Sequence, residues 1–172
     1  MDAHNIAAGA IPPGAIPPGT IPPIASLVPH SATMLLLDRV VATGKDTLQA
    51  EVAITPHTLF ADSSGVGSWI GIEYMAQAVA AYAGYNAGHH ANRRAGEAKV
   101  GFLLGSRRYT VSRGHFPLGS TLQIHVQRLL QAENGLGSFE CFIDDGAERI
   151  ASATLTVFQP PDLETFLEEG CI

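Results

Sequence analysis

Two polar side chains, Glu73 and Gln77, stand within an otherwise apolar stretch near the middle of the 172-residue chain. Four residues apart on a helix, they would share one face and lie within reach of each other. An ionised carboxylate in apolar surroundings loses hydration worth several kcal/mol, so it is paired, neutralised or kept for a function. A carboxyl group in a dry pocket suits general acid catalysis, which makes Glu73 the first candidate catalytic residue. The alternative is a structural carboxylate satisfied by Gln77 or by a backbone donor at a dimer interface.

An acid of this kind needs a base, and the chain offers seven histidines. His30 is preferred, because it lies between a proline and the apolar run 34–37, where a loop could deliver it to a pocket. His57, in a loop ahead of the helix, and His115, in a turn, remain alternatives. The other four are expected to be chemically inert: His4 in a tail, His125 facing solvent on a strand, and His89 and His90 at the helix exit.

Other chemistries lack the residues they need. No HExxH, HxxxH or CxxC spacing occurs, so neither a metal site nor a cofactor is expected. There is no GxSxG motif, which would mark a serine nucleophile elbow. No GxGxxG motif follows a strand, so nucleotide binding is not expected. Ten Lys and Arg against sixteen Asp and Glu give a net charge of −6, which argues against nucleic-acid binding. Cys141 and Cys171 match neither a disulfide framework nor a metal pair, and they suit a reducing compartment.

The elements that must position Glu73 are one helix and several strands. The stretch from Trp69 to Tyr85 predicts a helix that is apolar nearly all round, with Ser68 as its N-cap and Gly84 and Gly88 at its exit. A charged surface loop is expected over 91–99. The predicted strands are 47–54 and then, after a polar loop over 55–67 and the helix, four linked by hairpin turns: 100–112, 121–131, 137–144 and 149–158. This order predicts an α+β domain with an antiparallel sheet curled around the buried helix.

The first residues form a separate segment with a five-residue repeat. Residues 9–23 repeat Gly-Ala-Ile-Pro-Pro three times, with Thr for Ala in the last copy. Paired prolines favour an extended conformation, so residues 1–23 are expected to be a disordered tail, or alternatively a docking segment. Residues 24–172 are then a single domain. No run approaches the roughly 18 apolar residues of a membrane span, and a cytoplasmic location is expected.

Three segments carry a resemblance to a known family. They are residues 28–40, which include Pro29-His30 and Leu37-Asp38-Arg39; residues 71–78, Gly-Ile-Glu-Tyr-Met-Ala-Gln-Ala; and residues 101–109, Gly-Phe-Leu-Leu-Gly-Ser-Arg-Arg-Tyr. In this order they resemble motifs of hotdog-fold 3-hydroxyacyl-ACP dehydratases, in particular the dehydratase-like subunits of bacterial aryl-polyene clusters. The likeness runs from about Leu27 to Phe158. It implies the hotdog fold, a long central helix wrapped by a curved antiparallel sheet, and dimers with active sites across the interface.

The resemblance also implies a reaction, the elimination of water from a 3-hydroxyacyl thioester. A histidine would remove the C2 proton, and Glu73, which matches the helix acid, would protonate the departing hydroxyl. Backbone N–H groups at the helix start would polarise the thioester carbonyl. Residues expected to contact the substrate are Gln77, Ser68, Gly67 and Trp69.

The chain departs from the family at the base. Typical members carry it in a Gly-His-Phe-Pro loop before the helix, at a position that is Leu59 here. A similar sequence, Gly114-His115-Phe116-Pro117, follows the helix instead and is interpreted as a coincidence. Ser68 falls where the family has its carbonyl-polarising glycine, and Gly67 lies one place earlier.

Three hypotheses follow from these residues. The first is a dehydratase in which Glu73 is the acid and His30, or His57, is the base. The second is a non-catalytic or half-catalytic subunit of a hotdog heterodimer, and the third is an acyl thioesterase. The expected partners are an acyl carrier protein bearing the acyl substrate and a second hotdog subunit, identical or different. Because that carrier is acidic, it would need a local basic patch, for which the candidates are Arg93, Arg94, Lys99, Arg107, Arg108 and Arg113.

Overall fold

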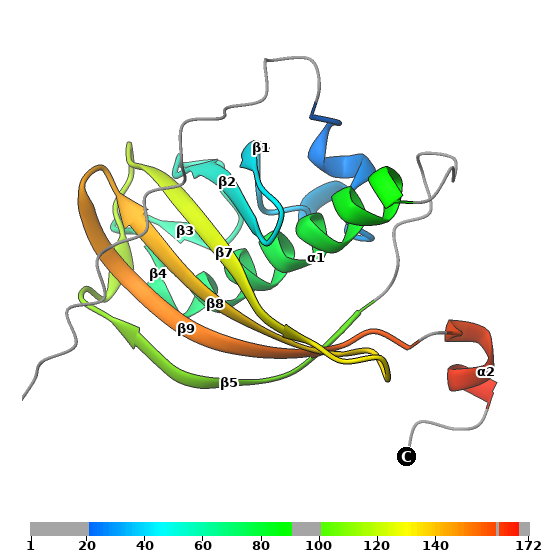
Figure 1. The fold of residues 1–172 in the computed structure, drawn as a ribbon. Coiled ribbons are helices and arrows are strands. Elements are labelled where there is room, and N and C mark those ends of the chain that lie inside the picture. The colour runs from blue at the N-terminus through cyan, green and yellow to red at the C-terminus, as the bar shows by residue number, and fades with distance from the viewer. Residues whose placement is uncertain (1–20, 91–100, 161, 169–172) are drawn as a thin grey trace, which may run out of the picture.

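The structure is a computed structural model that describes residues 21–90, 101–160 and 162–168. Its main element is a six-stranded antiparallel sheet in the order β1-β2-β7-β8-β9-β5. The strands are β1 (Arg39–Thr43), β2 (Thr47–Ala53), β7 (Thr121–Gln131), β8 (Leu136–Asp145), β9 (Glu148–Phe158) and β5 (Phe102–Val111). The sheet is curved, and the long helix α1 (Gly71–His90) lies along its concave side (Figure 1). The predicted α+β hotdog architecture is therefore confirmed.

The core forms where the sheet meets α1. Along the strands, apolar and polar side chains alternate, which places one set of each strand toward the helix. One row crosses the sheet from Leu48 through Val126 and Cys141 to Ala153, and all four side chains are buried. They pack with the buried face of α1, to which Tyr74, Met75, Ala78 and Ala81 belong.

The helix begins and ends differently from the prediction. Ser68 does not cap it, since residues Ser68–Ile70 form a 3₁₀ turn that no side chain caps, and α1 follows at Gly71. Nor does the helix end near Gly84, because it continues to His90. A Cβ at Gly84 would lie 2.0 Å from the Leu27 carbonyl oxygen, so this glycine lets the N-terminal segment pack directly against the helix.

The last four predicted strands are confirmed, and β7, β8 and β9 are joined by hairpin turns as predicted, whereas β5 and β7 are not. β5 lies beside β9 at the sheet edge instead of beside β7. Between β5 and β7 the chain enters a second, three-stranded sheet made of β3 (Ala61–Asp62), β4 (Gly65–Gly67) and β6 (His115–Phe116). In this small sheet β6 pairs with β4, and the chain then returns to the main sheet at β7. The segment predicted as a polar loop over 55–67 thus contains two short strands.

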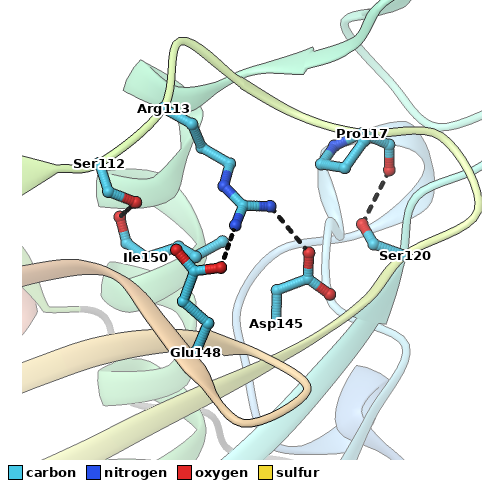
Figure 2. Close-up of polar contacts among 7 residues, drawn as sticks. All are labelled: Ser112, Arg113, Pro117, Ser120, Asp145, Glu148 and Ile150. Carbon is cyan, nitrogen blue, oxygen red and sulfur yellow. Dashed lines mark hydrogen bonds and ion pairs between the residues drawn. The ribbon is translucent and has the colours of Figure 1, made fainter.

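Ion pairs hold the segment that follows β5 against the main sheet. The Arg113 guanidinium contacts Asp145 at 3.1 Å and Glu148 at 2.6 Å, on the two sides of the β8–β9 turn (Figure 2). Nearby, the Ser120 hydroxyl donates to the Pro117 carbonyl at 2.8 Å. The connection between β5 and β7 is therefore anchored to the same end of the sheet.

Described residues near both ends of the chain also make packing contacts. Ile21, within the predicted tail over 1–23, packs against the core, whereas residues 1–20 of that tail and the predicted charged loop over 91–99 lie outside the described residues. Near the C-terminus, α2 (Leu163–Glu168) brings Phe166 against Phe102 and Phe158. No helix in the described ranges is long and apolar enough to cross a membrane.

Candidate active site

Gln77 is the buried centre of the site. Its side-chain nitrogen donates to the Met34 carbonyl at 2.8 Å and to Glu73 Oε1 at 2.9 Å, and its oxygen accepts from the Leu36 N–H at 2.9 Å. Both amide hydrogens and the amide oxygen are therefore engaged. This network ties the segment before β1 to α1 and holds one oxygen of the Glu73 carboxylate in place.

The same segment brings His30 to Glu73. The distance from His30 Nε2 to Glu73 Oε1 is 3.6 Å, and the two side chains are 31% and 38% exposed. The other ring nitrogen, Nδ1, is buried and makes no hydrogen bond within the described part of the chain. The two residues selected from the sequence as acid and base are thus neighbours, while their roles stay predictions.

A cavity of about 190 Å³ begins at this pair and runs along α1. Glu73, Ala76, Ala80 and Ala83 line it at helical spacing, so they form one stripe of the helix. The opposite wall comes from the sheet and includes Phe102, Leu103, Phe139 and Val157. The stripe spans about 15 Å at 1.5 Å per residue. An elongated apolar space with a carboxylate and an imidazole at one end suits a molecule with an alkyl or polyene chain and a polar reactive group.

The helix start forms a second part of the site. The Ser68 N–H donates to the Gly114 carbonyl at 3.0 Å, and the Ser68 carbonyl accepts the Tyr109 hydroxyl. The N–H groups that begin a helical segment lack intrahelical acceptors and carry its partial positive charge. The predicted substrate contacts Gly67, Ser68 and Trp69 lie here, just before Glu73, and none of the three lines the cavity.

Trp69 is the most exposed part of this region, at 67%. A Cβ at Gly67 would lie 2.1 Å from the Trp69 ring, so the indole rests on that glycine. The ring also meets His115 edge-on, with 6.2 Å between centroids, and His115 is paired with Gly67 in the small sheet. The Gly-His-Phe-Pro segment after β5 therefore docks beside the helix start, although its resemblance to the family loop is out of sequence order.

Two further histidines lie away from this pair. His57 is exposed and lines a different cleft, with Thr33 and Asp38. His125 was expected to face solvent, and that prediction is wrong: its side chain is only 17% exposed. It stacks on Phe142 at 4.5 Å and contacts Asp144 at 3.3 Å, and burial lowers its pKa, partly offset by the Asp144 charge. Long side chains on the outer face of the sheet cover one another, which alternation alone does not reveal.

Sequence reasoning missed two kinds of residue at the site. The alanines of the cavity stripe carry a signal in their spacing from Glu73, since small residues on one helix face leave room beside it. Tyr109 carries none, because its contact with Ser68 depends on an irregularity of β5. As for metals, the described residues contain no group of three or more His, Cys, Asp or Glu side chains that could hold an ion.

A curved antiparallel sheet around one long helix, with a carboxylate near the start of that helix, defines a hotdog-fold protein. Residues 22–168 match the model of the ApeP-like family, described as ApeP dehydratase, and the chain belongs to this family of dehydratases. The resemblance to aryl-polyene dehydratase subunits is therefore confirmed.

Solved structures agree with this assignment. The dehydratase heterocomplex ApeI:P from Xenorhabdus doucetiae is 27% identical, with a TM-score of 0.75 over 87% of this chain and 98% of that one. Cj0977, a virulence protein from Campylobacter jejuni, shares the fold at 12% identity and a TM-score of 0.56, over 81% of this chain and 89% of that one. Escherichia coli PaaI shares the fold at 13% identity and a TM-score of 0.51, over 70% of this chain and 77% of that one. No curated protein sequence matches the chain.

Proposed function

We propose that this protein dehydrates 3-hydroxyacyl thioesters to trans-2-enoyl thioesters, with Glu73 as general acid and His30 as general base. The observation that carries the proposal is the 3.6 Å approach of His30 Nε2 to Glu73 Oε1 at the end of an elongated apolar cavity. Membership of a dehydratase family supports the reaction class. The thioester would lie beside the pair, with its acyl chain along the alanine stripe.

The reaction needs two proton transfers, and the pair can perform both. His30 takes the C2 proton, the C2–H electrons form the new double bond, and the C3–O bond breaks. Glu73 protonates the departing oxygen, so that water leaves. Because Oε1 accepts the Gln77 amide, the proton given to the hydroxyl belongs on Oε2. A proton passing from His30 to Glu73 afterwards would restore both groups for the next cycle.

A second hotdog subunit is part of the proposal. β5 is an edge strand that pairs with β9 on one side and with no described strand on the other. Leu103 and Leu104 are exposed there, and Phe102 and Leu103 also line the cavity. Long exposed edges are normally covered. A partner paired along β5 would cover these leucines and close the cavity, in keeping with ApeI:P being a heterocomplex.

One observation favours a half-catalytic subunit as the second candidate. The position that carries the base in typical family members is Leu59, which is partly buried and packs against the core. In that case the partner would supply the histidine, and this chain would supply Glu73 and the cavity. The two candidates differ in whether His30 is needed.

The carrier is proposed to be an acidic acyl carrier protein that meets β5. Among the six basic residues considered from the sequence, Arg113 is already paired with two carboxylates (Figure 2). Arg107 and Arg108 are exposed, and no carboxylate of the described residues pairs with either. The other three, at 93, 94 and 99, lie outside the described residues.

The experiment is a dehydration assay with a 3-hydroxyacyl-ACP and this chain, with and without its co-expressed hotdog partner. Enoyl product that disappears in both Glu73→Gln and His30→Ala supports the proposal. Loss in Glu73→Gln alone favours the half-catalytic subunit. Free thiol without enoyl product contradicts both.

A further inference from the structure

Tyr109 is an unusual residue in an exposed strand. Within β5 only Phe102 and Tyr109 are partly buried, and Tyr109 packs against the core. Its hydroxyl donates to the Ser68 carbonyl, in the 3₁₀ turn that precedes α1. Burial raises the pKa of Tyr109 to about 12, so the hydroxyl stays protonated and remains a donor at neutral pH.

The backbone of β5 is distorted at this point. Arg107 pairs with Thr154 and Thr110 with Ser152, so β5 holds one more residue than β9 between these two pairs. Arg108, within this bulge, has φ of 53°, in the left-handed region that L side chains rarely adopt. Bulges redirect side chains. Tyr109 lies in this bulge, and its hydroxyl contacts Ser68 just before α1.

Gly71 makes room for that hydroxyl. A Cβ at Gly71 would lie 2.5 Å from the Tyr109 oxygen, so the first residue of α1 must lack a side chain for this contact to form. The Gly71 N–H also donates to the Ser68 carbonyl. That carbonyl oxygen therefore accepts two hydrogen bonds, from the helix and from β5, which fix its direction.

Fixing the Ser68 carbonyl also fixes the N–H of Trp69. The two groups belong to one trans peptide plane and point in opposite directions. The Trp69 N–H is among the first donors of the helical segment and has no acceptor within it. A donor held in advance toward developing negative charge is what stabilises an enolate-like transition state.

We propose that Tyr109 is a positioning residue, which orients the Ser68–Trp69 peptide so that the Trp69 N–H meets the thioester carbonyl oxygen of the substrate. This inference rests on the proposed dehydratase function. It also assigns a role to the bulge of β5, which links the proposed partner edge to the helix start.

The test compares Tyr109→Phe with a matched variant, Tyr82→Phe. The Tyr82 hydroxyl also donates to a backbone carbonyl, that of Lys45, at 3.2 Å and far along α1 from Ser68. In the dehydration assay with the partner subunit present, we expect Tyr109→Phe to lower kcat about 10-fold or more with little change in KM. Tyr82→Phe should keep kcat. Equal rates for the two variants overturn the inference.

A spectroscopic readout separates this inference from the proposed function. Trp69 is the only tryptophan of the chain, so ¹⁵N-tryptophan labelling reports its backbone amide alone beside the indole signal. We expect the Trp69 amide resonance to move in Tyr109→Phe and to stay in Tyr82→Phe. If Glu73→Gln keeps full activity, the proposed function fails, and the amide resonance still decides whether Tyr109 orients this peptide. If the Trp69 amide resonance does not shift in Tyr109→Phe, the positioning role of Tyr109 is overturned.

Discussion

His30 Nε2 lies 3.6 Å from Glu73 Oε1, although one residue precedes β1 and the other belongs to the first turn of α1. What joins them is Gln77, which binds Glu73 on its own helix and the backbone of Met34 and Leu36 in the segment that carries His30. A buried amide thus acts as the link between the proposed acid and the proposed base.

Gln77→Ala should destabilise the fold by about 2 kcal/mol or more, because it leaves the Leu36 N–H and the Met34 carbonyl without their partner. It should also release Glu73 and lower dehydration activity. Denaturant unfolding measures the first effect. The control is Gln127→Ala on the exposed side of β7, for which we expect a change within about 0.5 kcal/mol. Equal stability of the two variants would contradict the linking role.

Gly84→Ala tests the packing of the N-terminal segment on α1. Helix propensity alone predicts a gain of about 1 kcal/mol for this change. The new Cβ would lie 2.0 Å from the Leu27 carbonyl, so we expect a loss of about 1–3 kcal/mol instead. Gly114→Ala is the control, since nothing lies within 4 Å of its Cβ. Thermal unfolding of both variants decides the sign, and a stabilised Gly84→Ala would refute the close contact.

Stability should fall in mild acid because of His125. Burial, the larger cause, lowers its pKa below the ordinary 6.5; Asp144 raises it and Arg149 lowers it further. The unfolded chain therefore binds the proton more readily. The contribution of His125 is complete above pH 6.5 and is lost as pH falls from there through the folded-state pKa. His125→Gln should lose less stability than the native chain between pH 7.5 and 5.5, as measured by urea midpoints. Identical losses would contradict this.

Ala80→Leu should shorten the space for an acyl chain. Ala80 lies in the middle of the cavity stripe, between Ala76 and Ala83, so a larger apolar side chain would fill the gap between helix and sheet. We expect activity on long acyl chains to fall well below activity on short ones, while Glu73 and His30 remain in place. Comparing kcat/KM for short and long substrates measures this ratio. A ratio unchanged from the native protein would show that the chain binds elsewhere.

Most of the fold was predictable from the sequence, because its core follows short-range periodicity. Periodicity predicted the strands over 47–54 and 121–131, on which Leu48 and Val126 are buried, and the spacing of Glu73 and Gln77 predicted their contact. The edge position of β5 was not predictable, since it depends on β6 pairing with β4 far along the chain. Gly84 was mistaken for a helix end because a packing glycine and a terminating glycine look alike in sequence.

The site was predictable where chemistry is carried by residue type. Glu73 and His30 were selected as rare polar groups beside apolar runs, and the structure places them together. Tyr109 could not be selected, because its inward direction follows from a bulge and from the left-handed Arg108, neither of which leaves a periodic pattern. The covered His125 was missed for a related reason, since its neighbours Phe142 and Arg149 come from other strands.

The dehydration rate of Glu73→Gln, measured with a 3-hydroxyacyl-ACP in the presence of the hotdog partner, tests the central claim most directly. Glutamine keeps the shape of the side chain but cannot protonate a departing hydroxyl. A general acid contributes about 10²-fold or more, so the rate should fall by at least that factor while the unfolding midpoint stays near that of the native protein. Native activity in this variant would contradict the assignment of Glu73 as the acid.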